Sequence, residues 1–224
     1  MNLKLEEKNK KFFNKFASSY DVKIFKKWQE NIRKKIIEEA GIKGKQKTGN
    51  FLTNSPKRGR IEEAEIKNNS KILDAGCGTG EFLKLLLLEK KNLKLYGIDV
   101  SDEMLKIAGK KLGKKANLKL FSVEKANFKN NYFDYVFSED AFHHYADYDL
   151  VMKNFYRVLR KGGKLIIADF NFGAILNKVF HWLEPGNNKM HSKKQFIELF
   201  KKYKFKKIKQ KKINLIQVLT IGEK

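Results

Sequence analysis

Apolar residues follow a helical period over the first forty residues and then lose it. Residues 2–18 place large apolar side chains at helical spacing, and residues 21–40 repeat the pattern before Gly41, a residue typical of helix ends. Between residues 42 and 70 the period disappears, and glycine, proline and asparagine become frequent. The pattern predicts two helices followed by a flexible insertion that is longer than an ordinary loop.

From residue 71 onward, short apolar runs alternate with amphipathic segments. We predict strands over 71–74, 95–99, 118–123, 132–138 and 164–169. Between them, helices are expected over 81–89, after an N-cap at Ser101, and over 149–159. This alternation favours a parallel sheet covered by helices on both faces. In the tail, a helix over 193–203 precedes strands over 205–213 and 215–221, which can form an antiparallel pair at a sheet edge.

The first of these strands leads directly into a glycine-rich turn. Residues 71–80 read KILDAGCGTG, and the alternating glycines leave backbone amides open to a ligand where the next helix begins. Asp99 ends the second strand, 19 residues after Gly80. A carboxylate at that place in such a unit binds the hydroxyls of a ribose. The turn and Asp99 together predict a site for a nucleoside.

The spacing of the glycines also discriminates between ligands. Sites for dinucleotides use G-x-G-x-x-G to hold a pyrophosphate, whereas the third glycine here comes one residue earlier. Asp74 precedes the loop, and a carboxylate there disfavours a pyrophosphate and suits a cationic ligand. We therefore expect a nucleoside that carries positive charge.

Charge raises the question of a polyanionic partner. The 224-residue chain has 49 lysines and arginines against 25 acidic residues, a formal net charge of +24, and only five of the 49 are arginines. Proteins that recognise nucleic acid tend to use arginine, whose guanidinium group can form two parallel hydrogen bonds. An excess of lysine spread along the chain therefore indicates an ordinary solvated surface and not a nucleic-acid-binding one. The densest stretch, Lys193–Lys212, contains aromatic residues that fit either base stacking or a helix core. We favour the helix core.

The number of cysteines and the length of the apolar runs indicate the cellular compartment in which the protein is expected. The single cysteine, Cys77, excludes an intramolecular disulfide and favours a reducing compartment, so a cytoplasmic location is expected. Leu85–Leu88 is the longest aliphatic run, far shorter than the ~20 apolar residues of a membrane helix, so no membrane insertion is expected. The N-terminal residues have no apolar core of the kind found in a secretory signal.

Four segments resemble the motifs of one enzyme family. They are LDAGCGTG (73–80), GIDVSDEML (97–105), FDYVFSEDAFHHY (133–145) and RVLRKGGKLIIADF (157–170). Together they resemble the class I S-adenosylmethionine-dependent methyltransferases, in particular the methyltransferase type 11 group with its enzymes of ubiquinone and menaquinone biosynthesis. More loosely, FFNKFASSYD (12–21) is similar to the N-terminal cap helix of those enzymes.

The resemblance implies a fold and a division of the chain. The fold expected is α/β: a Rossmann-like, doubly wound, seven-stranded sheet, mostly parallel with an antiparallel C-terminal edge, plus an N-terminal helical cap. We expect the cap over residues 1–41, a flexible insertion over 42–70, and the S-adenosylmethionine-binding domain over 71–224.

The resemblance also implies S-adenosylmethionine as cofactor and a set of residues that bind it. The site is expected to comprise Asp74, Gly76, Gly78, Thr79, Asp99, Val100, Ser122, Val123 and Glu139. Ser122 and Val123 stand where such proteins often carry Asp-Ala beside the adenine. Because Asp74, Asp99, Glu139 and Asp140 fall at strand ends, we expect the crevice to be locally acidic in a protein whose basic charge is otherwise diffuse.

Catalytic residues are not assigned, but three candidates stand out. Tyr20 fits either a cation–π contact with a sulfonium or the turn that ends a helix. His143 and His144 fit either a general base or a structural pair, and we favour the structural interpretation. The histidines and Trp182 around the Pro185-Gly186 turn lack the spacing of a metal site, so no metal is expected.

We therefore expect a methyltransferase that acts by direct displacement on a small-molecule acceptor. Two alternatives stay open. The first is an RNA-modifying methyltransferase that uses the lysine-rich tail, with nucleic acid as its acceptor. The second is a non-catalytic partner subunit that keeps the methyltransferase fold.

Overall fold

The computed structural model describes residues 3–19, 23–41, 67–90, 92–171 and 188–224. Two helices come first, α1 (Leu3–Phe16) and α2 (Lys23–Glu39). The strands that follow are β1 (Lys71–Ala75), β2 (Lys94–Asp99), β3 (Ala116–Leu120), β4 (Phe133–Glu139), β5 (Leu159–Phe170), β6 (Lys206–Lys212) and β7 (Gln217–Glu223). The remaining helices are α3 (Glu81–Glu89), α4 (Asp102–Leu112), α5 (Tyr148–Val158) and α7 (Lys193–Lys202), with short 3-10 turns η1 (Gly113–Lys115), η2 (Val123–Lys125) and η3 (Phe142–His144).

All seven strands form one sheet in the order β3-β2-β1-β4-β5-β7-β6. The pairs from β3 to β5 are parallel, and β7 pairs antiparallel with both β5 and β6. The expected Rossmann-like sheet with an antiparallel C-terminal edge is thus confirmed. Asp74 is level with Gly97 on one side and Phe137 on the other. The carboxyl ends of β1, β2 and β4 therefore meet at one edge of the sheet, where Asp99 and Glu139 lie.

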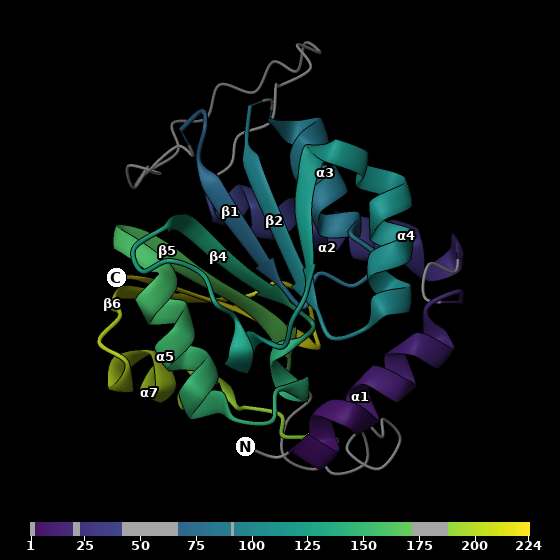
Figure 1. Ribbon diagram of the computed structural model, residues 1–224. Helices are drawn as coiled ribbons and strands as arrows, with labels where there is room; N and C mark the ends of the chain where they lie inside the picture. Colours follow the sequence, from purple (N-terminus) through teal and green to yellow (C-terminus); the bar gives the residue numbers. More distant parts are fainter. Residues whose placement is uncertain (1–2, 20–22, 42–66, 91, 172–187) are drawn as a thin grey trace.

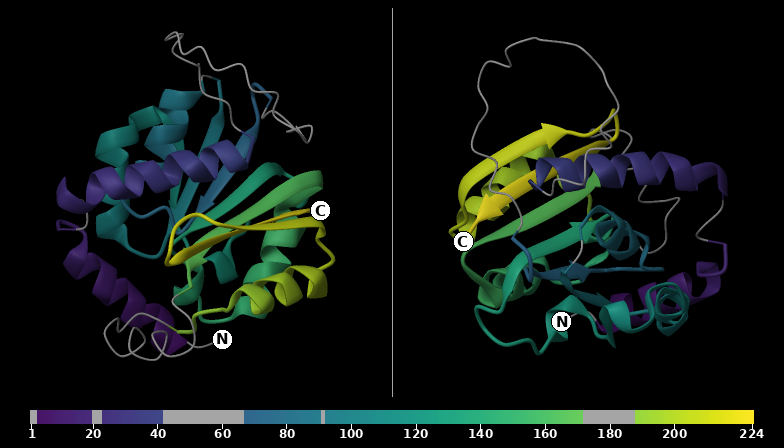
Figure 2. Two further views of the ribbon diagram at one scale, coloured as in Figure 1. Left: turned by 180° about the vertical axis from the view of Figure 1, so that it is seen from behind. Right: turned by 90° about the horizontal axis from the view of Figure 1, so that it is seen from above.

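Helices cover both faces of the sheet (Figures 1 and 2). On one face, α2 and α3 bury a cluster around Ile36, Leu86 and Phe137. On the other face, α5 and α7 bury a cluster around Phe155 and Phe200. The helix α1 instead lies beyond the carboxyl ends of the strands, next to α4 (Figure 1). None of the described helices is long and apolar enough to cross a membrane.

Side-chain caps fix where several helices begin. The Ser101 hydroxyl accepts a hydrogen bond from the Met104 amide at 3.1 Å, as its place before α4 predicted. Asp147 caps α5 in the same way, and Ser192 forms a reciprocal capping box with Gln195 at the start of α7. Gly41 has a φ of 83°, consistent with its predicted place just after α2.

Two predicted boundaries were wrong. The third strand was expected over 118–123, but β3 pairs with β2 only as far as Asp99 and ends at Leu120. Ser122 and Val123 consequently lie in the turn that leads into η2. The fifth strand was expected from residue 164, but β5 begins at Leu159, which pairs with Phe133 across a bulge. The division of the chain into cap, insertion and cofactor domain stays a prediction.

Candidate functional site

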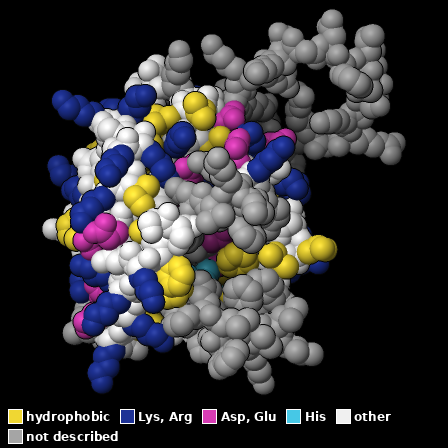
Figure 3. Space-filling model, turned by 90° about the vertical axis from the view of Figure 1, so that its right-hand side faces the viewer, with side chains coloured by type: hydrophobic (Ala, Val, Ile, Leu, Met, Phe, Trp, Pro, Cys, Tyr) yellow, Lys and Arg dark blue, Asp and Glu magenta, His cyan; other side chains and the backbone are white. Residues whose placement is uncertain are grey.

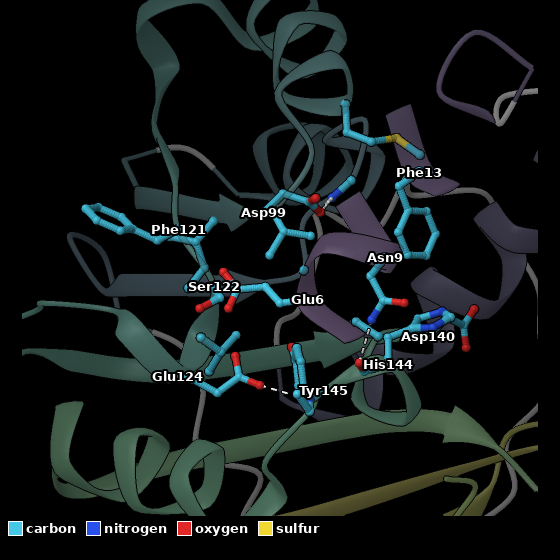
Figure 4. A pocket seen from close by; sticks show the side chains of 18 of the residues that line it. Glu6, Asn9, Phe13, Asp99, Phe121, Ser122, Glu124, Asp140, His144 and Tyr145 are labelled. Carbon is cyan, nitrogen blue, oxygen red and sulfur yellow. Dashed lines mark hydrogen bonds between the residues drawn. The ribbon is translucent and has the colours of Figure 1, made fainter. Parts of the chain in front are cut away.

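A pocket opens at the carboxyl ends of the strands, beneath α1. Its volume is about 720 Å³, counting its open mouth. The loops after β1, β2, β3 and β4 form its floor and sides, and α1 supplies Glu6, Asn9 and Phe13 (Figure 4). The predicted residues that line it are Gly76, Gly78, Asp99, Val100, Ser122, Val123, Glu139 and His144.

Four other predicted residues lie elsewhere. Asp74 and Thr79 are buried and do not line the pocket. His143 is also buried behind the pocket wall. Tyr20 lies outside the described residues, as do the insertion from 42 to 66 and the segment with Trp182. The sequence therefore predicted eight of the nineteen residues that line the pocket, and it also included residues that support the wall from behind.

The glycine-rich loop is held against Asp99. The Gly78 amide donates to one Asp99 carboxylate oxygen at 2.8 Å, and the Ser101 amide donates to the other at 2.9 Å. Burial raises the pKa of Asp99, while these backbone donors oppose that rise. The two bonds orient the carboxylate at the pocket wall (Figure 4).

The glycines at 76 and 78 are required for different reasons. Gly76 has a φ of 78°, and a Cβ on it would lie 2.5 Å from the Cβ of Ala141, so a side chain would push the loop away from β4. Gly78 has a φ of 50°, and a Cβ there would meet nothing within 4 Å. Because Gly78 lines the pocket, a side chain at this position would take up space that a ligand needs.

Five carboxylates line the pocket, namely Glu6, Asp99, Glu124, Glu139 and Asp140. Within the described part of the chain, no lysine or arginine lines it. Figure 3 shows basic side chains projecting around the rim of one face, with acidic side chains and a histidine nearer its centre. The expected acidic crevice is present, except that Asp74 lies behind it. Such a pocket attracts cations in a protein of net charge +24.

Buried charge links the N-terminal helices to this pocket. Arg33 of α2 donates from its Nε to Glu139 at 2.8 Å. Burial and the nearby Glu139 carboxylate raise the pKa of Asp74 well above its usual value, and Arg33 acts against that rise. Sequence reasoning missed Arg33, because α2 was identified only as an amphipathic helix and the pair joins residues 106 positions apart.

Asp140 follows directly after β4 and lines the pocket. Burial raises the pKa of Asp140 to about 8, and the charges of Glu139 and Asp169 add to the rise. A hydrogen bond from the Gln217 side-chain amide, 2.6 Å away, partly opposes it. Asp140 also has a φ of 48°, a conformation that aspartate and asparagine tolerate better than most residues.

The two histidines are placed differently. His143 is 1% exposed, and both its backbone amide and its Nδ1 bond the Asp169 carboxylate, at 2.9 and 2.6 Å. His144 lines the pocket, its ring packs edge-on against Phe13 of α1, and its carbonyl accepts a bond from Asn9 at 2.7 Å. The geometry of His143 agrees with the structural role favoured above, and His144 faces the ligand space.

Several wall residues carried no signal of their own in the sequence. Tyr145 donates from its hydroxyl to the Ala75 carbonyl at 2.9 Å and lies 3.0 Å from the Ser138 hydroxyl, so it ties the glycine loop to β4. Met104, Phe121 and Glu124 also line the pocket. The residues from α1 were likewise missed, since the helical pattern there indicated only packing. Among the described residues, no group of three or more His, Cys, Asp or Glu side chains could hold a metal ion.

The pocket fits a cationic nucleoside such as S-adenosylmethionine. The buried polar atoms of its lining residues that have no hydrogen-bond partner among the described residues include the Ser122 hydroxyl and one Glu139 carboxylate oxygen. Buried polar atoms in proteins are normally paired, so a bound ligand with hydrogen-bonding groups accounts for both. The open space at Gly78 leaves room for such a ligand beside the loop.

Comparison with known proteins agrees with this geometry. The family described as "Methyltransferase domain" matches residues 73–167. Phosphoethanolamine N-methyltransferase 1 of Triticum aestivum is 28% identical over 157 residues, 66% of this chain and 30% of that protein. An uncharacterized methyltransferase of Bacillus mycoides is 35% identical over 118 residues, 50% of this chain and 52% of that protein. The chain thus spans about a third to a half of these relatives.

Solved structures show the same fold. A chain from the complex of the Haloferax volcanii Trm112 methyltransferase activator with a methyltransferase superposes with a TM-score of 0.73 at 16% identity, covering 94% of this chain and 96% of that one. Phosphoethanolamine N-methyltransferase 2 of Haemonchus contortus, in complex with phosphomonomethylethanolamine and S-adenosylhomocysteine, gives a TM-score of 0.64 at 21% identity, covering 71% and 49%. Residues 73–167 therefore match a methyltransferase domain, the chain has the fold of class I methyltransferases, and these matches support S-adenosylmethionine as its cofactor.

Proposed function

We propose that this methyltransferase acts on a small molecule and methylates an amine nitrogen by direct displacement. The observation that carries the proposal is the single pocket in which Asp99 and the glycine loop meet Asp140 and His144, walled by carboxylates. An acidic wall suits a protonated amine as well as a cationic cofactor. Two of the proteins described above are named as N-methyltransferases of phosphoethanolamine, which agrees with nitrogen as the acceptor atom, whereas the acidic wall of this pocket favours an amine without the phosphate.

Residues at one end of the pocket would hold the cofactor. Asp99 would accept hydrogen bonds from the ribose hydroxyls, and the backbone at Gly76 and Gly78 would lie against the ligand. Val100 and Val123 provide apolar surface for the adenine, next to the free Ser122 hydroxyl. Glu139 contributes negative charge, and the buried Asp74 and Thr79 would support the loop from behind.

Residues at the other end would act on the acceptor. When bound, S-adenosylmethionine supplies an electrophilic methyl group, so displacement by the acceptor needs no covalent enzyme intermediate. An ammonium group must lose a proton before its nitrogen can attack. Asp140 has a pKa of about 8, near that of a useful general base, and it lines the pocket beside His144. We assign proton removal to Asp140.

The residues that line the pocket argue against an RNA-modifying enzyme and against a non-catalytic subunit. RNA or a phosphorylated acceptor would meet five carboxylates and, among the described wall residues, no lysine or arginine. The intact glycine loop and Asp99 argue against a purely non-catalytic subunit. A cytoplasmic location stays a prediction that rests on the single cysteine, Cys77, which is buried and free.

Methyl transfer to paired amines tests the proposal. The purified chain is incubated with methyl-labelled S-adenosylmethionine and with either ethanolamine or a longer primary diamine, each compared with its phosphorylated or N-acetylated counterpart. We expect labelling of unmodified amines and little labelling of the counterparts. Labelling confined to RNA, or to the counterparts, would contradict the proposal. The Asp140→Asn variant serves as the matched control and should bind S-adenosylhomocysteine but transfer at least about a hundredfold more slowly.

A further inference from the structure

Asn9 of α1 presents one unused polar atom at the pocket. The residue is only 5% exposed, and its side-chain nitrogen donates to the His144 carbonyl at 2.7 Å. A carbonyl oxygen can only accept a hydrogen bond, so the amide nitrogen must be the atom that faces it. This fixes the orientation of the amide and leaves the side-chain oxygen, Oδ1, pointing elsewhere.

That oxygen has no hydrogen-bond partner among the described residues. A second asparagine of the same helix shows what a purely structural contact looks like. Asn14 donates to Asp102 at 3.0 Å and accepts from the Ser101 hydroxyl at 2.6 Å, so both of its polar atoms are paired. Contacts that anchor α1 therefore account for both polar atoms of the Asn14 side chain, but for only one of the two polar atoms of the Asn9 side chain. Buried acceptors are rarely left unpaired, so Asn9 calls for a donor from a ligand.

The surroundings indicate what kind of donor this is. Figure 4 shows Asn9 at the end of the pocket where Phe13, Asp140 and His144 gather, away from Ser122 and Phe121. The amide oxygen and the Asp140 carboxylate both accept hydrogen bonds there. A group with several N–H donors and positive charge satisfies both acceptors, whereas a carboxylate or phosphate satisfies neither.

We propose that the side-chain oxygen of Asn9 binds the ammonium group of the methyl acceptor and holds its nitrogen for transfer. This inference rests on the proposed amine specificity of the same pocket and adds a residue from α1 to the acceptor site. Asn9 acts here as a binding residue, and its other amide atom keeps α1 against His144.

Sinefungin provides a probe that does not require the natural acceptor. It is an analogue of S-adenosylmethionine in which an amine-bearing carbon replaces the methylated sulfur, so its amine lies where the methyl group departs. Calorimetry compares its affinity with that of S-adenosylhomocysteine, which lacks the amine. The ratio of the two affinities is measured for the wild type and for Asn9→Ala, Asn9→Asp and Asn14→Ala, after thermal melting shows that each is folded.

We expect the wild type to prefer sinefungin, and Asn9→Ala to lose about tenfold of that preference, the effect of one hydrogen bond to a charged group. Asn9→Asp keeps an oxygen at the position but removes the donor to the His144 carbonyl, so its melting temperature should fall while it retains the preference. Asn14→Ala, which loosens α1 without removing the pocket oxygen, should retain it as well. The inference would be overturned if the wild type did not prefer sinefungin, or if Asn9→Ala kept the preference of the wild type. It would also be overturned if Asn14→Ala lost as much of the preference as Asn9→Ala. Failure of the wild type to bind S-adenosylhomocysteine would instead overturn the proposed function.

Discussion

The guanidinium of Arg33 lies 2.8 Å from the carboxylate of Glu139 and joins α2 to the end of β4 at the pocket wall. Both side chains are largely buried, 11% and 7% exposed. The nearby Asp74 carboxylate is also buried, so Arg33 is positioned to balance more than one negative charge. The contact makes the stability of the pocket depend on a helix far away in the sequence.

Arg33→Met is expected to destabilise the protein by about 3–5 kcal/mol, since it leaves Glu139 charged, buried and unpaired. Urea denaturation followed by circular dichroism measures the change. The double variant Arg33→Met with Glu139→Gln should recover part of the loss, because the remaining buried charge is then removed as well. If the Arg33→Met variant were as stable as the wild type, the ion pair would not contribute to the free energy of unfolding.

Asp140→Asn should raise stability while it lowers activity. The folded-state pKa of Asp140 is about 8, against a usual value of 3.8, so the folded protein holds this proton more tightly than the unfolded chain does. Its contribution to stability is present below about pH 4 and is lost as pH rises through about 8. Asparagine tolerates the positive φ and can still accept from Gln217.

Measuring the free energy of unfolding of the wild type and of Asp140→Asn from pH 5 to 9 tests the predicted gain in stability. The variant should be more stable than the wild type at pH 8, by at least about 1 kcal/mol, and its stability should vary less with pH. Methyl transfer by the wild type should increase as Asp140 ionises around pH 8. Equal pH profiles for the two proteins would refute both the raised pKa and the role assigned to Asp140.

His143→Ala is expected to affect folding more than chemistry. Among the described residues, three groups donate to the buried Asp169, namely the His143 ring and the backbone amides of His143 and Phe170, and the substitution removes the first. We expect a loss of about 2–4 kcal/mol in stability, with affinity for S-adenosylhomocysteine changed by less than about threefold. A folded variant with normal cofactor affinity and turnover reduced by more than about a hundredfold would show instead that His143 takes part in the reaction.

Binding of RNA should be weak and sensitive to salt. The lysines of β6 and α7 belong to the most lysine-rich stretch of the chain, but several are paired with carboxylates, such as Lys211 with Glu39 and Lys202 with Asp149. In filter binding with total RNA, affinity should fall steeply between low and physiological salt. Tight retention of one RNA species at physiological salt, with methyl incorporation into it, would favour the RNA-modifying alternative.

Local features of the sequence were sufficient to predict that Asp99 and the glycine loop lie together at the pocket, where we propose that the cofactor binds. Asp99 and the glycines belong to one strand–helix–strand unit, β1–α3–β2, so their spacing predicted that they come together, and the structure joins Gly78 to Asp99 directly. The third strand was extended too far because its apolar run continues to Val123, while its pairing ends with β2. A hydrophobic pattern does not show where a neighbouring strand stops.

The contacts of α1 and α2 with the pocket, and the proposed acceptor end, could not be predicted in the same way. Asn9 contacts His144 across 135 residues, and Arg33 contacts Glu139 across 106. Such pairs depend on how α1 and α2 cross the strand ends, and helical periodicity does not specify that. Asp140 was identified as acidic and at a strand end, but its raised pKa follows from burial among other carboxylates, which only the packed structure reveals.

Calorimetric titration with S-adenosylhomocysteine and with NAD, for the wild type and for Asp99→Ala, tests the central assignment most directly. We predict a dissociation constant in the micromolar range for S-adenosylhomocysteine, about −7 to −8 kcal/mol, and no binding of NAD. Asp99→Ala should weaken binding by at least about tenfold, because the ribose hydroxyls lose a charged acceptor. Binding of NAD with no heat from S-adenosylhomocysteine, or an Asp99→Ala variant with unchanged affinity, would contradict the account of this pocket.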